Sequence, residues 1–149
     1  MSTKDVGALL HGLLFAYQKA TKQVLGSGWE IFVNPTLEIL AKIDEREGSH
    51  LCTGANLDEA MTAYSKMLHD AGIVEKIIFE KIGDNKYLFK VDGCIWAKHI
   101  HQELKPKDVT CPLALIAMSM YRKYKNVKVE ETESKYLEKG TETVIKSYP

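Results

Sequence analysis

The sequence predicts an α+β fold: an antiparallel sheet of two hairpins with about four helices packed against it. Apolar residues recur at helical spacing in three segments of the first half of the chain. Two later regions, 73–93 and 127–148, instead have strand-like composition or alternation around short turns. A very apolar segment between these regions is typical of a buried helix. Because helices and hairpins are segregated along the chain, an α+β fold is favoured over a parallel one.

The first half contains the three predicted amphipathic helices. Asp5 is a candidate cap for a helix that runs to about Leu25, and Gly26 supplies a left-handed end. Its apolar residues near one face are Val6, Leu9, Leu10, Leu13, Tyr17 and Val24. Pro35 suits the first turn of a second helix that closes at Gly48. Asn56 is predicted to cap the third helix, whose apolar face is Leu57, Ala60, Met61, Tyr64 and Leu68.

The second half contains the two hairpins and the apolar helix. Residues 73–82 are rich in β-branched side chains, and "GDNK" is a turn that leads into a returning strand over 87–93. A buried helix is predicted from Pro112 to Tyr124, with Asn126 as its end. Residues 127–134 and 141–149 then form the second hairpin around "YLEKG".

The bulk composition describes one ordinary globular domain over residues 1–149. Twenty basic residues balance twenty acidic residues, so no overall field attracts nucleic acid or anionic lipid, and no nucleic-acid partner is predicted. No segment has the length and apolarity of a transmembrane segment, and no signal peptide is recognisable. An odd and small number of cysteines favours a reducing compartment over a disulfide framework, which predicts a cytoplasmic protein.

Two segments carry a resemblance to a known family. Cys111 opens the apolar helix, and Glu131 and Gly140 follow in the last hairpin. This arrangement resembles the 4-vinyl-reductase-type (hydrocarbon-binding) domain and, more distantly, the subunits of the TRAPP vesicle-tethering complex. "LCTGANLDEAMTAYSKML" resembles the loop and helix of those subunits in which a cysteine faces an acyl-binding channel, and Cys52 is the matching residue. The chain departs from the pattern in the last hairpin, where Ser134 and Thr141 or Thr143 stand near the places of two family cysteines.

The resemblance implies a domain that binds a small molecule or an acyl chain, with a sensing or scaffolding role and without catalysis of its own. The apolar helix is expected to pack across the hairpins and to leave an apolar pocket. The predicted lining residues are Leu13, Cys52, Met61, Tyr64, Phe79, Trp96, Leu115 and Met118, with Leu9 and Phe15 beside them. Cys52 has two interpretations: a thiol at the mouth of the pocket, open to acylation, or a shielded residue under the third helix.

The stretch "CIWAKHIHQELKPKDVTC" raises a second hypothesis. Cys94, His99, His101 and Cys111 are the ligand types that suit zinc or ferrous iron, although their spacing matches no standard finger. His99 and His101 would share a face if residues 95–101 were extended. Cys94 and Cys111 would form a redox pair if they lay within disulfide reach, with the thiol pKa of Cys111 lowered at a helix N-terminus. The favoured interpretation is two core cysteines with surface histidines between them.

A third hypothesis is a dimeric interaction scaffold. The first helix carries apolar residues on more than one side, among them Leu9, Leu10, Leu13, Leu14 and Phe15, which predicts a homodimer. No nucleophile elbow, P-loop, dinucleotide fingerprint or zinc-protease motif occurs, so an enzyme is not indicated.

Overall fold

The structure is a computed structural model, and it describes residues 2–26, 30–50, 52–105 and 109–149. It confirms the α+β class: helices pack against a four-stranded antiparallel sheet with the strand order β1-β2-β4-β3. The strands are β1 (Lys76–Gly83), β2 (Lys86–Asp92), β3 (Lys128–Tyr136) and β4 (Thr141–Tyr148). The two predicted hairpins are β1–β2 and β3–β4, and antiparallel pairing of β2 with β4 joins them into one sheet.

Helix α1 (Thr3–Leu25) begins two residues before the predicted cap. Ser2 is the N-cap, and Asp5 completes a capping box because its carboxylate accepts from the Ser2 amide. Helix α2 (Glu30–Glu47) also begins earlier than predicted, so Pro35 lies inside the helix rather than in its first turn. The C-terminal glycines behave as predicted, since Gly26 and Gly48 both adopt positive φ.

Helix α3 (Leu57–Asp70) matches its prediction closely. The Asn56 side chain caps it by accepting from the Glu59 amide at 3.0 Å. The predicted apolar face is the buried face, comprising Leu57, Ala60, Met61, Tyr64 and Leu68. The strand that follows starts later than predicted, because residues 73–75 form the connection into β1.

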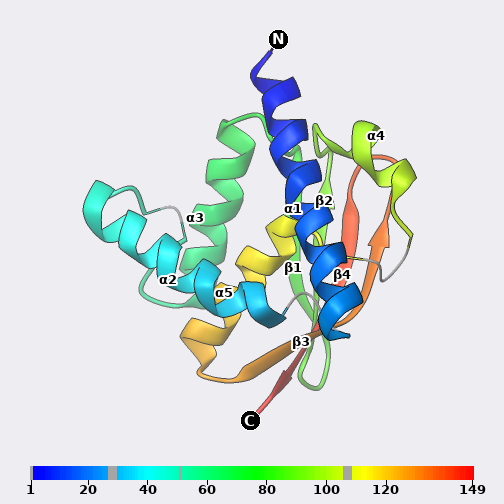
Figure 1. The fold of residues 1–149 in the computed structure, drawn as a ribbon. Helices are drawn as coiled ribbons and strands as arrows, with labels where there is room; N and C mark the ends of the chain where they lie inside the picture. Colours follow the sequence, from blue (N-terminus) through cyan, green and yellow to red (C-terminus); the bar gives the residue numbers. More distant parts are fainter. Residues whose placement is uncertain (1, 27–29, 51, 106–108) are drawn as a thin grey trace.

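Helix α5 (Pro112–Lys125) is the centre of the helical layer (Figure 1). It packs against α2, α3 and β3, and every residue from Pro112 to Tyr121 except Ile116 is buried. Two side-chain hydrogen bonds fix its position. The Ser119 hydroxyl donates to the Val33 carbonyl of α2 at 3.0 Å, and the Tyr64 hydroxyl of α3 donates to the Leu113 carbonyl at 3.1 Å. Asn126 ends the helix in the left-handed conformation, as predicted.

The segment after β2 is helical rather than extended. Helix α4 (Ala97–Ile100) continues into a 3₁₀ turn, η1 (His101–Glu103). Residues two apart in a helix point in different directions. His99 is therefore exposed while His101 is buried, and the shared face that would let both histidines reach one metal ion does not form.

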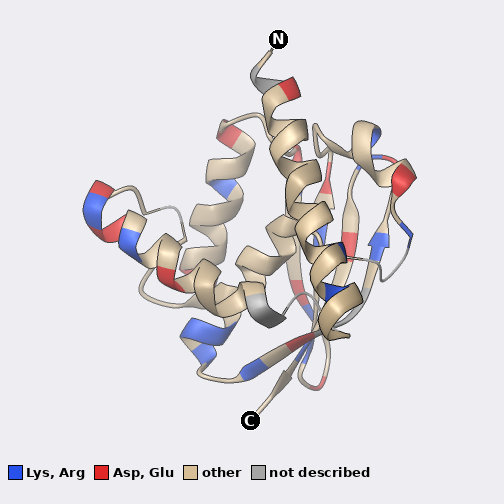
Figure 2. Cartoon of the chain, in the orientation of Figure 1, with Lys and Arg blue, Asp and Glu red and all other residues tan. Residues whose placement is uncertain are grey.

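The inward face of α1 is not its most apolar one. His11, Phe15 and Gln18 are buried, and α1 contacts α4 and α5. The large apolar residues of the helix, in contrast, are 44–80% exposed: Val6, Leu9, Leu10, Leu13, Leu14, Tyr17, Val24 and Leu25. Figure 2 shows the same helix almost free of charge along its middle. Within the described residues, no helix has the length and apolarity needed to cross a membrane.

Candidate functional site

Among the cavities that the described residues line, none is formed by the predicted pocket residues together. Tyr64 and Met118 are fully buried in the core, and Leu13 points outward from α1. The Trp96 ring packs against Gly7 and His11. The remaining four are divided among three separate cavities, with Met61 and Phe79 in one, Leu115 in the second and Cys52 in the third. The reason is that α5 fills the space over the hairpins instead of bridging it.

An apolar cavity of about 170 Å³ lies between α1, α2 and α5. It is lined by Leu14, Gln18, Phe32, Thr36, Pro112, Leu115 and Ile116. Leu115 is the one member of the predicted set that contributes to it. A space of this size and character suits a compact apolar molecule, because an engineered apolar cavity of about 150 Å³ stays dry and takes up benzene.

Gln18 is polar, but its amide is already satisfied at the edge of this cavity. Its Nε2 donates to the Thr110 carbonyl at 2.8 Å, and its Oε1 accepts from the Thr110 amide at 2.9 Å. This buried pair of hydrogen bonds ties α1 to the start of α5. The cavity presents mainly apolar surface, because six of its seven described lining residues contribute chiefly carbon atoms and the seventh, Gln18, has its amide held by Thr110.

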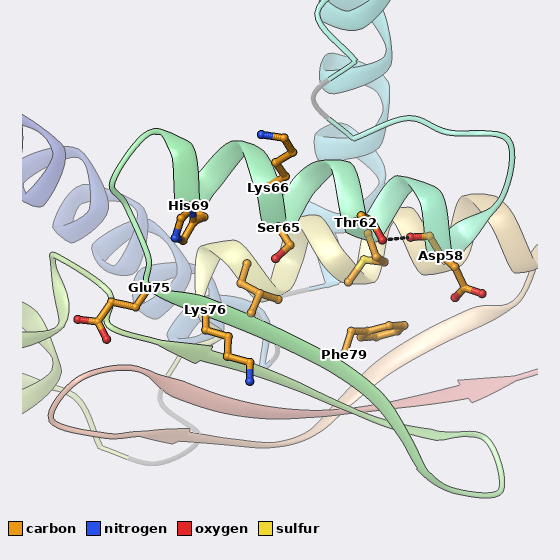
Figure 3. Close-up of a pocket in the computed structure, with 10 residues that line it drawn as sticks. Asp58, Thr62, Ser65, Lys66, His69, Glu75, Lys76 and Phe79 are labelled. Carbon is orange, nitrogen blue, oxygen red and sulfur yellow. Dashed lines mark hydrogen bonds between the residues drawn. The ribbon is translucent and has the colours of Figure 1, made fainter.

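A groove of about 450 Å³ runs between α3 and β1 (Figure 3). Met61, Ile77 and Phe79 form its apolar part, while Thr62 and Ser65 place hydroxyls on the helix side. The remaining lining residues are charged or titratable: Asp58, Lys66, His69, Glu75 and Lys76. Sequence reasoning did not single out these polar residues. They come from two elements, and the distance between those elements depends on how α3 packs against the sheet.

Cys52 is a shielded residue rather than a thiol at a pocket mouth. It is 6% exposed, and the crevice that it lines has a volume of only about 10 Å³. Burial, reinforced by the nearby Asp44 carboxylate, raises the pKa of the Cys52 thiol to about 12. A thiol with so high a pKa is a poor nucleophile, which favours the second of its two interpretations.

The structure does not bring the four residues of the metal hypothesis together as a set of ligands. Cys94 and Cys111 are buried free thiols in the main core, and burial raises the pKa of each despite nearby hydrogen-bond donors. The lowered pKa expected for Cys111 at the start of α5 is thus wrong, because desolvation outweighs the helix terminus. Among the described residues, no group of three or more His, Cys, Asp and Glu side chains is placed to hold a metal ion.

His101 instead holds the loop between β3 and β4. Its Nδ1 donates to the Leu137 carbonyl at 2.8 Å, and its other side faces a cavity of about 650 Å³ that His99 and Glu138 also line. Burial lowers the pKa of His101, so its neutral form is favoured. This arrangement satisfies a backbone carbonyl and gives the residue a structural role.

An aromatic cluster docks α1 on the rest of the molecule. The His11 ring lies 4.8 Å from the rings of Phe15 and Trp96, measured between centroids. Tyr136 of β3 extends the cluster, with its ring 5.9 Å from Phe15 and 5.2 Å from His101. Burial, together with the charge of His101, lowers the pKa of His11 to about 4. The neutral form of His11 is therefore the one that this cluster favours.

Comparisons with known proteins assign no family. No family model matches the chain, and no curated protein matches it. One solved structure that resembles it is described as modulating haem redox potential through protein-induced porphyrin distortion. It matches at 12% identity with a TM-score of 0.46, and the match covers 86% of this chain and 69% of that one. A variant of Tt H-NOX matches at 14% identity and 0.46, covering 86% and 66%. A third, from a study of haem distortion in the H-NOX family, matches at 11% and 0.44, with the same coverage. At this sequence identity and TM-score, the likeness does not assign a family or a ligand to this chain.

Proposed function

We propose that the chain is a small-molecule binding domain whose ligand is a compact apolar molecule held between α1, α2 and α5. The observation that carries the proposal is the apolar cavity of about 170 Å³ beside the satisfied Gln18 amide. Binding sites for apolar ligands are typically concave and apolar, with few polar groups. The resemblance of the segment around Cys111 to hydrocarbon-binding domains supports the same class of ligand.

The size of the cavity limits the ligand. A space of about 170 Å³ holds a ring or a short chain, so a long acyl chain requires α1 to move away from α5. Such movement would expose Phe15 and break the hydrogen bonds between Gln18 and Thr110, at a cost of roughly 1–3 kcal/mol for the buried amide alone. We therefore favour short ligands over long acyl chains.

A series of ligands of graded length tests this proposal. Toluene, indole and fatty acids of increasing length are titrated into the protein, and binding is measured as a rise in melting temperature and by calorimetry. The small aromatics are expected to bind, and long acids are expected to bind more weakly. Leu115→Phe fills the cavity and is expected to abolish binding, whereas Ile39→Phe on the exposed side of α2 is the matched control. Equal binding by both variants would contradict the proposal.

A second candidate function, a homodimeric scaffold, is favoured by the outer face of α1. The exposed apolar residues along this face recur at steps of four, three, four and seven positions. They are Val6, Leu10, Leu13, Tyr17 and Val24. This is the spacing of a seam between two helices. A standard interface buries about 800 Å² per partner. The five residues of the seam supply roughly 500 Å² of that area at roughly 100 Å² each, the value implied by the transfer free energy of a leucine, and neighbouring residues would supply the rest.

A further inference from the structure

The cavity between α1, α2 and α5 is lined by a buried amide with an unused hydrogen-bond donor. This amide belongs to Gln18, which is 1% exposed. The two bonds to Thr110 engage both Oε1 and Nε2, but they use only one of the two N–H groups on Nε2. Among the described residues, no group accepts from the other N–H. Because buried donors in folded proteins are nearly always paired, this N–H favours a bound acceptor.

A second donor of the cavity is the hydroxyl of Thr36, on the α2 wall. Hydroxyl groups inside a helix commonly donate to the carbonyl four residues earlier. Thr21, Thr62 and Ser119 do so in their own helices, each at 2.8 Å. Thr36 does not, and within the part of the chain that the structure describes its hydroxyl has no hydrogen-bond partner. The hydroxyl is therefore available to a ligand.

The rest of the described lining is uncharged and apolar. It consists of Leu14, Phe32, Pro112, Leu115 and Ile116. A carboxylate or an ammonium group placed here would lose its hydration without gaining an opposite charge, so a neutral ligand is favoured. Two unused donors in an uncharged cavity are complementary to a neutral acceptor. A carbonyl oxygen is such an acceptor, since it has two lone pairs and no proton to place.

We propose that Gln18 and Thr36 determine the specificity of this cavity, and that its ligand is a compact neutral molecule with one accepting oxygen, as in a small ketone. The oxygen accepts from the second N–H of Gln18, with the Thr36 hydroxyl as the other donor, and the hydrocarbon part contacts the apolar lining. This inference rests on the proposed function and narrows its class of ligand.

Two ligands of nearly the same shape test the inference. Cyclohexanone and methylenecyclohexane differ only in a C=O group in place of a C=CH2 group. The Kd of each is measured for the wild type and for Thr36→Val, which keeps the shape of the side chain but removes its hydroxyl. Comparing the ratio of the two Kd values between proteins cancels the difference in hydration of the ligands.

The preference for the ketone is expected to fall by about three- to tenfold in Thr36→Val, because one neutral hydrogen bond is lost. Thr62→Val is the matched control. Its hydroxyl donates to its own helix, and Thr62 does not line this cavity, so the ratio should stay at the wild-type value.

The Gln18 amide is followed by NMR of nitrogen-15-labelled protein, because a substitution of Gln18 would also break the bonds to Thr110. Cyclohexanone is expected to shift one of the two Nε2 protons downfield, and methylenecyclohexane is not. If both ligands bind but the Gln18 protons do not distinguish them, or Thr36→Val keeps the wild-type ratio, this inference is wrong and the apolar cavity remains the binding site. If neither ligand binds, the inference and the proposed function are both wrong.

Discussion

His11 is a buried residue whose protonation is expected to destabilise the fold. It is 4% exposed, and its Nε2 has no hydrogen-bond partner within the described part of the chain. Its ring contacts Phe15 and Trp96, and the nearest titratable neighbour is His101, which also favours the neutral form. Among the described residues no carboxylate acts on the pKa of His11, so protonation works against the docking of α1.

The free energy of unfolding is therefore expected to fall under mild acid. His11 takes up its proton at about 6.5 in the unfolded chain and at about 4 in the fold. Between these values the unfolded state binds more protons, so stability is lost as the pH falls through that window. The loss from His11 amounts to about 3 kcal/mol at most.

Chemical denaturation of His11→Phe at pH 7, 5 and 4 tests this expectation. The variant keeps an aromatic ring but removes the titration, so its stability should fall less between pH 7 and pH 4. His69→Gln, which removes an exposed histidine, serves as the control. An unchanged dependence on pH in His11→Phe would show that His11 does not carry the effect.

At the scale of elements, α1 and α3 show when an apolar pattern predicts a buried face. In α3 the apolar residues occupy one face and polar residues cover the others, so the buried face was predicted correctly. In α1 apolar residues lie on several sides, and the side that packs inward carries His11 and Gln18. Their partners, Trp96 and Thr110, lie far along the chain, and the pattern within the helix contains no information about them.

The exposed face of α1 leads to a prediction about assembly. Light scattering after size-exclusion chromatography is expected to give twice the chain mass of 16.8 kDa at micromolar concentration. Leu10→Glu with Leu13→Glu places charges in the proposed seam and is expected to yield monomers. Ile39→Glu changes an equally exposed apolar residue on α2 and should leave the dimer intact. A wild-type mass near 16.8 kDa would rule out this interface.

At the scale of the whole molecule, the three cysteines are part of the hydrophobic core to which helices and sheet contribute. Cys52, Cys94 and Cys111 belong to one hydrophobic cluster with residues of α2, α3, α5 and the sheet. Burial raises the pKa of each thiol, so the reactive thiolate is scarce in the fold.

Thiol labelling is expected to require unfolding. The native protein at pH 8 should react slowly with Ellman's reagent, and all three thiols should react once urea unfolds the chain. Elemental analysis of untagged protein is the companion measurement, and it should find zinc and iron well below one equivalent. Rapid labelling of the native protein would contradict the burial of the thiols, and one equivalent of bound metal would return Cys94 and Cys111 to the role of ligands.

The sequence by itself determined the α+β class, both hairpins and the ends of several helices. These features depend on local signals: the Asn56 cap, the left-handed Gly26 and Asn126, and the strand-forming segments around "GDNK" and "YLEKG". Each acts within a few residues, so it can be recognised without knowledge of the fold. The shared face of His99 and His101 depended on an extended segment over 95–101, and the short helix there separates the two side chains.

Only the tertiary structure decided which surfaces meet. Gly140 is a turn glycine in the sequence, but in the fold a Cβ at this position would lie 1.8 Å from the Val91 carbonyl oxygen of β2. The apolar cavity likewise requires α1, α2 and α5 to converge, and the groove requires α3 to lie along the free edge of β1. Such contacts join residues distant in sequence, and their free energy depends on the packing of both partners. A pattern within one segment therefore cannot specify them.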